Sequence, residues 1–220
     1  NTLKLRPGTS EISVFNGRIT CSRAVIRAAA NRGIKFKTFE YVSFKGVYIK
    51  YDGVMPHDLD YTRRLVEKLY LEYRDDAQEI SQYFYNSKRS NKFVGDRVFT
   101  EKQSAGLLPR EWDNSSRNIV FFTSTDFELA AIGPDYCYTL FSNQIDAIQA
   151  VIDTLGLSEK LYVRMHPNFS HSHRSDIERF QELHDGIKCI VILPDDPVST
   201  YALLDSCDLV IGFSSTVTAE

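Results

Sequence analysis

The sequence predicts an α/β protein built on parallel sheets, and three observations lead to that fold class. Four short apolar runs typical of buried strands recur along the second half of the 220-residue chain, at residues 118–122, 161–165, 189–193 and 209–212. Stretches with the apolar spacing of helices separate these runs, and no Gly-rich hairpin turn joins them. Strands that alternate with helices at this repeat length form βαβ units, whose strands are parallel and whose helices cover both faces of the sheet.

The first half begins with the same strand and helix pattern. Residues 12–15 read as a short strand, Asn16-Gly17 as a turn, and the Ala/Arg-rich stretch 22–31 as a helix that ends near Gly33. Two further strands are expected at 37–42 and 47–51. Apolar residues at helical spacing then predict one long amphipathic helix over residues 60–84.

The second half continues with helices expected at residues 144–155, 175–183 and 198–206. A polar stretch with Gly and Pro separates the two halves, so we expect a first domain over residues 1–100, a linker to about residue 117 and a second domain over 118–220. The chain starts without Met and stops at Glu220, directly after a Ser/Thr-rich loop. We therefore expect a fragment in which both domains are incomplete.

Composition limits the classes of function. The formal net charge is −3, from 26 basic and 29 acidic residues that are mixed along the chain, so no basic patch for nucleic acid is expected. The four cysteines are far apart and form no CxxC pair, which argues against a structural metal site or a disulfide framework. No apolar run reaches the roughly 18 residues of a membrane span, and the start lacks the apolar core of a signal peptide. A cytoplasmic protein without metal or cofactor is expected.

Polar side chains follow each predicted strand of the second half. Ligands of open parallel sheets bind beyond the carboxyl ends of the strands, so these loops are the candidate site. No GxGxxG fingerprint or P-loop lysine occurs there, which argues against a dinucleotide reductase or an ATPase. In strand order, the loops contribute Thr123-Ser124, His166-Pro167-Asn168, Asp195-Asp196 and Ser214-Ser215-Thr216.

Two of these loops suggest a phosphate site. Hydroxyls and unpaired backbone N–H groups at a helix start favour an anion, although Ser214-Ser215-Thr216 has the equally ordinary reading of a helix N-cap. His166 is suited to donate a hydrogen bond to a phosphate or to carry a proton, with a purely structural role as the alternative. Arg164 lies two residues earlier on the same strand face, within reach of an anion or of a neighbouring carboxylate.

Three segments together resemble a known enzyme family. They are residues 164–168 (RMHPN), residues 194–204 (PDDPVSTYALL) and residues 207–216 (CDLVIGFSST) followed by Glu220. The His-Pro and Ser-Ser/Thr motifs at successive strand ends are similar to those of capsule polysaccharide biosynthesis glycosyltransferases, and of the Kdo transferases and polysialyltransferases that use CMP-activated sugars. Residues 121–128 resemble the family's first nucleotide-domain strand, and residues 15–40 more loosely resemble its acceptor-side domain.

The resemblance implies a GT-B-like fold, with two Rossmann-like domains and parallel sheets, and a metal-independent glycosyltransferase that builds a surface or capsular polysaccharide. It implies that His166, Ser214, Ser215 and Thr216 hold the donor's phosphates and that Glu220 holds ribose or sugar hydroxyls. The partners would be a nucleotide-sugar, with a CMP-sugar favoured, and a glycan or lipid-linked acceptor. Such acceptors lie at the inner face of the membrane, so peripheral association is compatible with it. The nucleotide-sugar site is expected to comprise Thr123, Ser124, Arg164, His166, Pro167, Asn168, Ser214, Ser215, Thr216 and Glu220.

Catalysis would require His166 beside the leaving phosphate and a base from the first domain, for which Glu40 and Glu11 are candidates. Two other functions stay open. A sugar-nucleotide epimerase of the UDP-GlcNAc 2-epimerase kind shares the fold and a His-Pro-Asn-like strand end, but its later motif is Gly-rich, unlike Ser214-Ser215-Thr216. A non-catalytic nucleotide-binding module is the second alternative.

Overall fold

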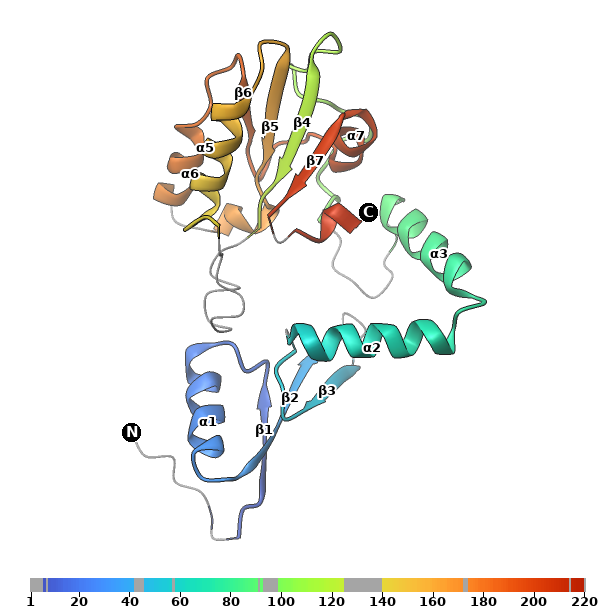
Figure 1. Cartoon of the computed structure of the whole chain (residues 1–220), viewed down its shortest axis with the longest axis vertical. Helices are drawn as coiled ribbons and strands as arrows, with labels where there is room; N and C mark the ends of the chain where they lie inside the picture. Colours follow the sequence, from blue (N-terminus) through green and yellow to red (C-terminus); the bar gives the residue numbers. More distant parts are fainter. Residues whose placement is uncertain are drawn as a thin grey trace. The chain divides into compact units, whose positions relative to one another are not determined.

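The structure is a computed structural model of the chain that describes residue 6 and residues 8–41, 46–56, 58–90, 92, 99–124, 140–171, 174–213 and 215–219. Two compact units make up the chain, one formed mainly by residues up to 97 and the other mainly by residues from 98 onward (Figure 1). Both combine helices with a sheet, so the protein is of the α/β class. Ser214 and Glu220 lie outside the described residues.

The second unit holds a four-stranded sheet in which every pair is parallel. The strands are β4 (Arg117–Phe122), β5 (Glu159–Arg164), β6 (Cys189–Ile192) and β7 (Leu209–Gly212), in the order β6-β5-β4-β7. Phe122 pairs with Arg164 of β5 on one side and with Gly212 of β7 on the other. The chain therefore adds strands outward from β4 in one direction and then returns to add β7 on the other side, which creates a switch point between β4 and β7.

Helices cover both faces of this sheet, as Figure 1 shows. Helices α5 (Gln144–Thr154) and α6 (Arg174–Gln181) pack on one face, where Ile148 and Phe180 meet alternate residues of the strands such as Phe121 and Val163. Helix α7 (Thr200–Ser206) packs on the other face, with Leu203 against Tyr162 and its neighbours. The prediction of a parallel sheet with helices on both faces is confirmed.

Residues 99–117, which the sequence suggested as the end of a linker, pack against the second sheet. The Trp112 ring lies 4.5 Å from the Tyr162 ring between centroids, and the Tyr162 hydroxyl donates to the carbonyl of Glu111 at 3.0 Å. The Ser199 N–H donates to the Leu107 carbonyl at 2.8 Å, just before α7 begins. Polar composition alone did not reveal this packing, because most of these contacts are made by backbone atoms.

The first unit contains β1 (Glu11–Phe15), β2 (Lys35–Tyr41) and β3 (Tyr48–Asp52), in that order. β1 and β2 are parallel, but β2 and β3 are antiparallel, so this sheet is mixed and the expected all-parallel sheet is wrong for it. The cause is the length of the connection. Only six residues separate β2 from β3, whereas a crossover between parallel strands needs about a dozen or more.

Helix α1 (Thr20–Ala30) connects β1 to β2 and buries Ile26 and Ala29 against the sheet, as its Ala-rich face predicts. Gly33 ends it as expected. The φ of Gly33 is +64°, and the N–H groups of Gly33 and Ile34 donate to the carbonyls of Ala30 and Ala29, both at 3.0 Å. This pair of bonds is a Schellman motif, which glycine favours because it has no Cβ to clash in the left-handed conformation.

The single helix expected over residues 60–84 is instead two helices, α2 (Leu59–Glu72) and α3 (Ala77–Arg89). The first ends at Tyr73, which has φ −115° and ψ 29°, and Arg74, Asp75 and Asp76 form the turn. Paired Asp residues weaken a helix because their carboxylates compete for backbone N–H groups. Apolar periodicity continues across this break, which explains why the pattern predicted one helix. Among the described residues, no helix is long and apolar enough to cross a bilayer.

Candidate functional site

The carboxyl ends of β4, β5 and β7 bring most of the predicted site residues to one edge of the second sheet. Thr123 follows β4 directly, and its N–H donates to the carbonyl of Arg164 at 3.1 Å, which extends the ladder by one residue. Phe213 follows β7, and its N–H donates to the Phe122 carbonyl at 3.1 Å. The edge beside the switch point is therefore formed by the loops after β4, β5 and β7, which is where a doubly wound sheet places its ligand.

His166 lies in the loop after β5 with its orientation fixed by three contacts. Its backbone N–H donates to the Thr123 hydroxyl oxygen at 2.9 Å, and its Nδ1 accepts the Asn168 N–H at 3.1 Å. Its ring also meets the Phe99 ring edge to face, with centroids 5.0 Å apart. Because Nδ1 serves as an acceptor, the proton of the neutral imidazole sits on Nε2, which makes Nε2 a hydrogen-bond donor.

Pro167 and Asn168 lie in a short 3-10 helix, Pro167–His171, that turns the chain away from the strand. The ring of Phe169 packs against Phe180 of α6 at a centroid distance of 5.3 Å, which fixes this turn on the core. Asn168 thus orients His166 through its backbone N–H. The sequence predicted the His-Pro-Asn loop at this edge, and the structure places it there.

Arg164 contacts protein carbonyls at this edge. Arg164 is 3% exposed, and its guanidinium donates to the carbonyls of Leu193 at 2.6 Å and Asp196 at 3.3 Å. Burial lowers the pKa of Arg164 to about 10, while Asp196 and Asp195 oppose this shift. A guanidinium with that pKa is still charged at neutral pH. In this structure Arg164 therefore ties β5 to the turn after β6, and two of its donors are engaged there.

The hydroxyl residues at this edge differ in exposure. Thr123 is buried with its hydroxyl bound to His166, and Ser124 is also buried. Ser215 is half-buried and Thr216 is exposed, at the start of the 3-10 helix Thr216–Ala219. Gly212 allows this turn to fold over the end of β7, because a Cβ there would overlap the Thr218 methyl carbon. Of the predicted hydroxyl residues that the structure describes here, Ser215 and Thr216 thus retain solvent exposure.

Two contributors to this edge were not predicted. Gln144, the first residue of α5, is fully buried and bonds to the backbone of Ser124. Phe99 belongs to the stretch expected to end the first domain, yet it contacts His166. A buried Gln at a helix start has no distinctive sequence pattern. The aromatic signal of Phe99 was present, but nothing in the sequence tied it to the His-Pro loop.

In the first unit, Glu40 lies at the carboxyl end of β2 and its carboxylate accepts a hydrogen bond from the Asn16 side chain. Asn16 is 3% exposed and adopts φ +59°, and its side-chain Oδ1 accepts the Arg18 N–H at 3.1 Å. A positioned carboxylate beside a tight turn is therefore present at this strand end. Glu11 lies at the amino end of β1, so the structure does not bring these two candidates together.

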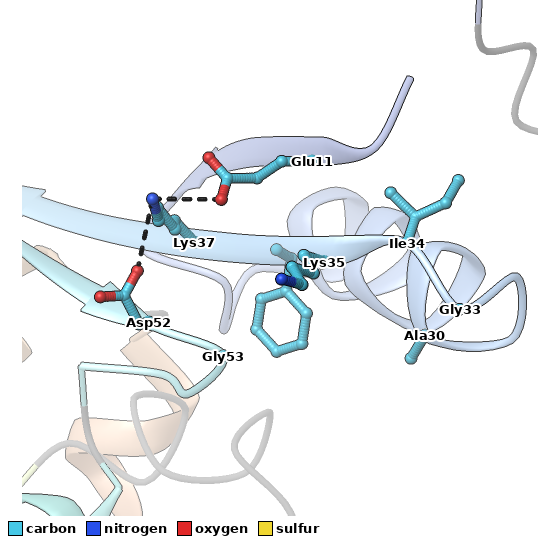
Figure 2. A pocket seen from close by; sticks show the side chains of 9 residues that line it. Glu11, Ala30, Gly33, Ile34, Lys35, Lys37, Asp52 and Gly53 are labelled. Carbon is cyan, nitrogen blue, oxygen red and sulfur yellow. Dashed lines mark ion pairs between the residues drawn. The ribbon is translucent and has the colours of Figure 1, made fainter. Parts of the chain in front are cut away.

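A cavity of about 550 Å³ in the first unit lies at the amino end of β2 (Figure 2), and Glu40 is not among the residues that line it. Lys37 stands between Glu11 and Asp52, with Nζ to oxygen distances of 3.1 and 3.6 Å, and hydrogen bonding to Glu11 is the main cause that raises the pKa of Lys37. Its charge is thus matched by two carboxylates. The cavity is lined by Glu11, Ala30, Gly33, Ile34, Lys35, Phe36, Lys37, Asp52 and Gly53.

Within the described ranges, no group of three His, Cys, Asp or Glu side chains is arranged to hold a metal ion. Comparison of the chain with family models found no match, and no curated protein sequence matches it either.

Proposed function

We propose that the protein is a glycosyltransferase that moves a sugar from a nucleotide-sugar, with a CMP-sugar favoured, to a surface or capsular polysaccharide acceptor. The two units would be parts of the two Rossmann-like domains of a GT-B enzyme. The observation that carries the proposal is the placement of His166, with Nε2 as a donor, beside the switch point of a parallel sheet. The His-Pro and Ser-Ser/Thr motifs that suggest this family lie at the ends of β5 and β7.

The reaction requires a group that stabilises negative charge on the departing phosphate. As the acceptor oxygen bonds to the anomeric carbon, the bond from that carbon to the phosphate oxygen breaks and its electron pair stays with the phosphate. The Nε2–H of His166 would donate to that oxygen, and the exposed hydroxyl of Thr216 would donate to another phosphate oxygen. Donors that are already oriented stabilise the transition state without the cost of reorganisation.

The acceptor hydroxyl must also lose its proton. Glu40 is the candidate base, because its carboxylate lies at a strand end and is oriented by the buried Asn16. No metal ion takes part in this scheme. Ser214 and Glu220 keep their proposed roles as phosphate and ribose or sugar-hydroxyl ligands, and the acceptor would be a growing glycan or a lipid-linked one at the inner membrane face.

The test is release of nucleotide from CMP- and UDP-sugars, measured with EDTA present, by the protein and by His166→Ala. Loss of one donor to a developing charge should lower kcat by roughly 10²–10³-fold with a smaller change in KM. His184→Ala is the matched control, because His184 also accepts a backbone N–H, that of Val191 at 3.0 Å. His184 precedes β6 in the chain and does not belong to the loops that follow β4, β5 and β7.

The other outcomes are equally informative. Conversion of UDP-GlcNAc to its epimer would indicate the epimerase, and nucleotide binding without turnover would indicate a binding module. Equal loss of kcat in His166→Ala and His184→Ala would contradict a catalytic role of His166, because a structural role would then explain the effect of both changes.

A further inference from the structure

We propose that Gln144 is a positioning residue for the nucleotide site, because it holds in place Thr123 and Ser124, the two residues directly after β4, and Thr123 is hydrogen-bonded to His166. This inference rests on the proposed function, because it assigns Gln144 a role in binding the nucleotide. Gln144 is the first residue of α5 and is completely buried. No pattern in the sequence distinguishes it from an ordinary helix residue.

The side chain of Gln144 makes a reciprocal pair of hydrogen bonds with one residue. Its Oε1 accepts the Ser124 N–H at 2.7 Å, and its Nε2 donates to the Ser124 carbonyl at 2.7 Å. Ser124 lies beyond the last ladder pair of β4, which joins Phe122 to Arg164 and to Gly212. A primary amide carries the same donor and acceptor as a peptide group. Gln144 therefore gives Ser124 the two backbone hydrogen bonds that a neighbouring strand would supply within a sheet.

The position of Gln144 is itself fixed by the start of α5. Asn143 is the N-cap, and its side-chain oxygen accepts the Asp146 N–H at 3.0 Å. Ala147 and Ile148, the other buried residues of this helix, lie in the core against the sheet. Because the N-cap and the core contacts hold this turn of helix in place, the side-chain amide of Gln144 has a fixed position from which it bonds to Ser124.

The loop held by Gln144 contacts the candidate donor group directly. Thr123 precedes Ser124, and its hydroxyl oxygen accepts the backbone N–H of His166 at 2.9 Å. A chain of contacts thus runs from α5 through Ser124 and Thr123 to His166. Displacement of Ser124 would move the acceptor that holds His166, and misplacement of a catalytic group by about 1 Å can lower the reaction rate by about 100-fold.

The first experiment compares Gln144→Leu with Gln149→Leu in the whole chain. Both changes remove an amide from α5, but Gln149 is exposed and bonds to Asp153 on the same helix. The phosphate of CMP carries the charge that the His166 donor would contact, and losing one hydrogen bond to a charged group weakens binding by about tenfold to a hundredfold. We expect a loss of that size in CMP affinity per folded molecule for Gln144→Leu, as measured by titration calorimetry, and no change for Gln149→Leu. Hydrogen exchange at the Ser124 amide should speed up in Gln144→Leu alone.

The second experiment uses Gln144→Glu to separate positioning from general stability. A protonated carboxyl group has a donor and an acceptor, as the amide has, whereas a carboxylate cannot donate to the Ser124 carbonyl. CMP affinity of this variant should approach the wild-type value at low pH and fall as the introduced group ionises. Burial should move that ionisation above the usual carboxyl range. The wild-type affinity profile serves as the reference.

The outcomes distinguish the two proposals. If the wild type binds CMP and Gln144→Leu binds it equally tightly per folded molecule, the role of Gln144 is wrong while the proposed function stands. A Gln144→Glu profile parallel to that of the wild type would also overturn it. If the wild type binds none of the nucleotides or nucleotide-sugars, the proposed function fails, and the role of Gln144 in nucleotide binding fails with it.

Discussion

Replacing Gly17 with Ala should destabilise the first unit for two separable reasons. Gly17 adopts φ +90°, and a Cβ built on it would lie 2.8 Å from the Ile26 Cδ1 and 3.2 Å from the Thr38 Cγ2. The backbone conformation costs a non-glycine residue about 1–2 kcal/mol, and crowding in a packed core costs about 1–3 kcal/mol. We therefore expect Gly17→Ala to lower the free energy of unfolding by about 2–5 kcal/mol.

Gly53→Ala is the matched control for the backbone cost. Gly53 adopts φ +71° in the same unit, and nothing lies within 4 Å of the position that a Cβ would take there. It should lose only the backbone contribution of about 1–2 kcal/mol. For a domain of 60–100 residues, about 1 kcal/mol shifts Tm by about 4–8 °C. The steric part alone should therefore separate the two variants by about 10 °C in far-UV circular dichroism melts.

A double-mutant cycle identifies the crowding atom. Ile26→Val removes the Cδ1 that the new methyl group would meet, at an expected cost of about 0.5–1.5 kcal/mol by itself. The double variant Gly17→Ala/Ile26→Val should lose less free energy of unfolding than the sum of the two single variants, by about 1 kcal/mol. Trp112, the one tryptophan of the sequence, lies in the second unit, and its fluorescence should keep its transition midpoint. Strict additivity of the two changes, or equal melts for Gly17→Ala and Gly53→Ala, would refute the reasoning.

Two further predictions concern the second unit. Hydrogen bonds from Ser115, Ser116 and Lys160 hold the pKa of Asp113 well below its usual value of 3.8. The stability that Asp113 contributes is therefore present above pH 3.8 and lost as the pH falls below it. Asp113→Asn should flatten the dependence of the urea midpoint on pH between about 4 and 2, and an unchanged slope would contradict this. Burial raises the pKa of the Cys189 thiol to about 12, while Cys21 is exposed, so iodoacetamide at pH 8 should modify Cys21 and spare Cys189 until the protein unfolds, as peptide mass spectrometry would reveal.

Sequence reasoning was most successful where burial is uniform. β4, β5 and β6 are buried along most of their length, so they read as continuous apolar runs, and the observed bounds of all four strands lie within two residues of the expected ones. It failed where a local interruption does not change the apolar spacing. The turn at residues 74–76 divides a helix without disturbing the apolar positions on either side. The antiparallel β3 could have been predicted, because the expected strands 37–42 and 47–51 are only four residues apart, too few for a crossover between parallel strands.

The site illustrates a different limit, because Arg164 and His166 share one strand face but differ in their surroundings. Alternation along the strand predicts that both side chains leave it on the same face. The two residues differ in where they lie relative to the last hydrogen-bonded pair of the sheet. Arg164 pairs with Ile192 at the last step of the β5–β6 ladder, where the chain turns back over residues 193–196 and offers it two carbonyls. His166 lies two residues beyond, where the Thr123 hydroxyl and the Asn168 N–H determine its orientation. Arg164, which was expected to bind an anion, thus holds the turn after β6, and His166 remains the candidate that contacts the nucleotide.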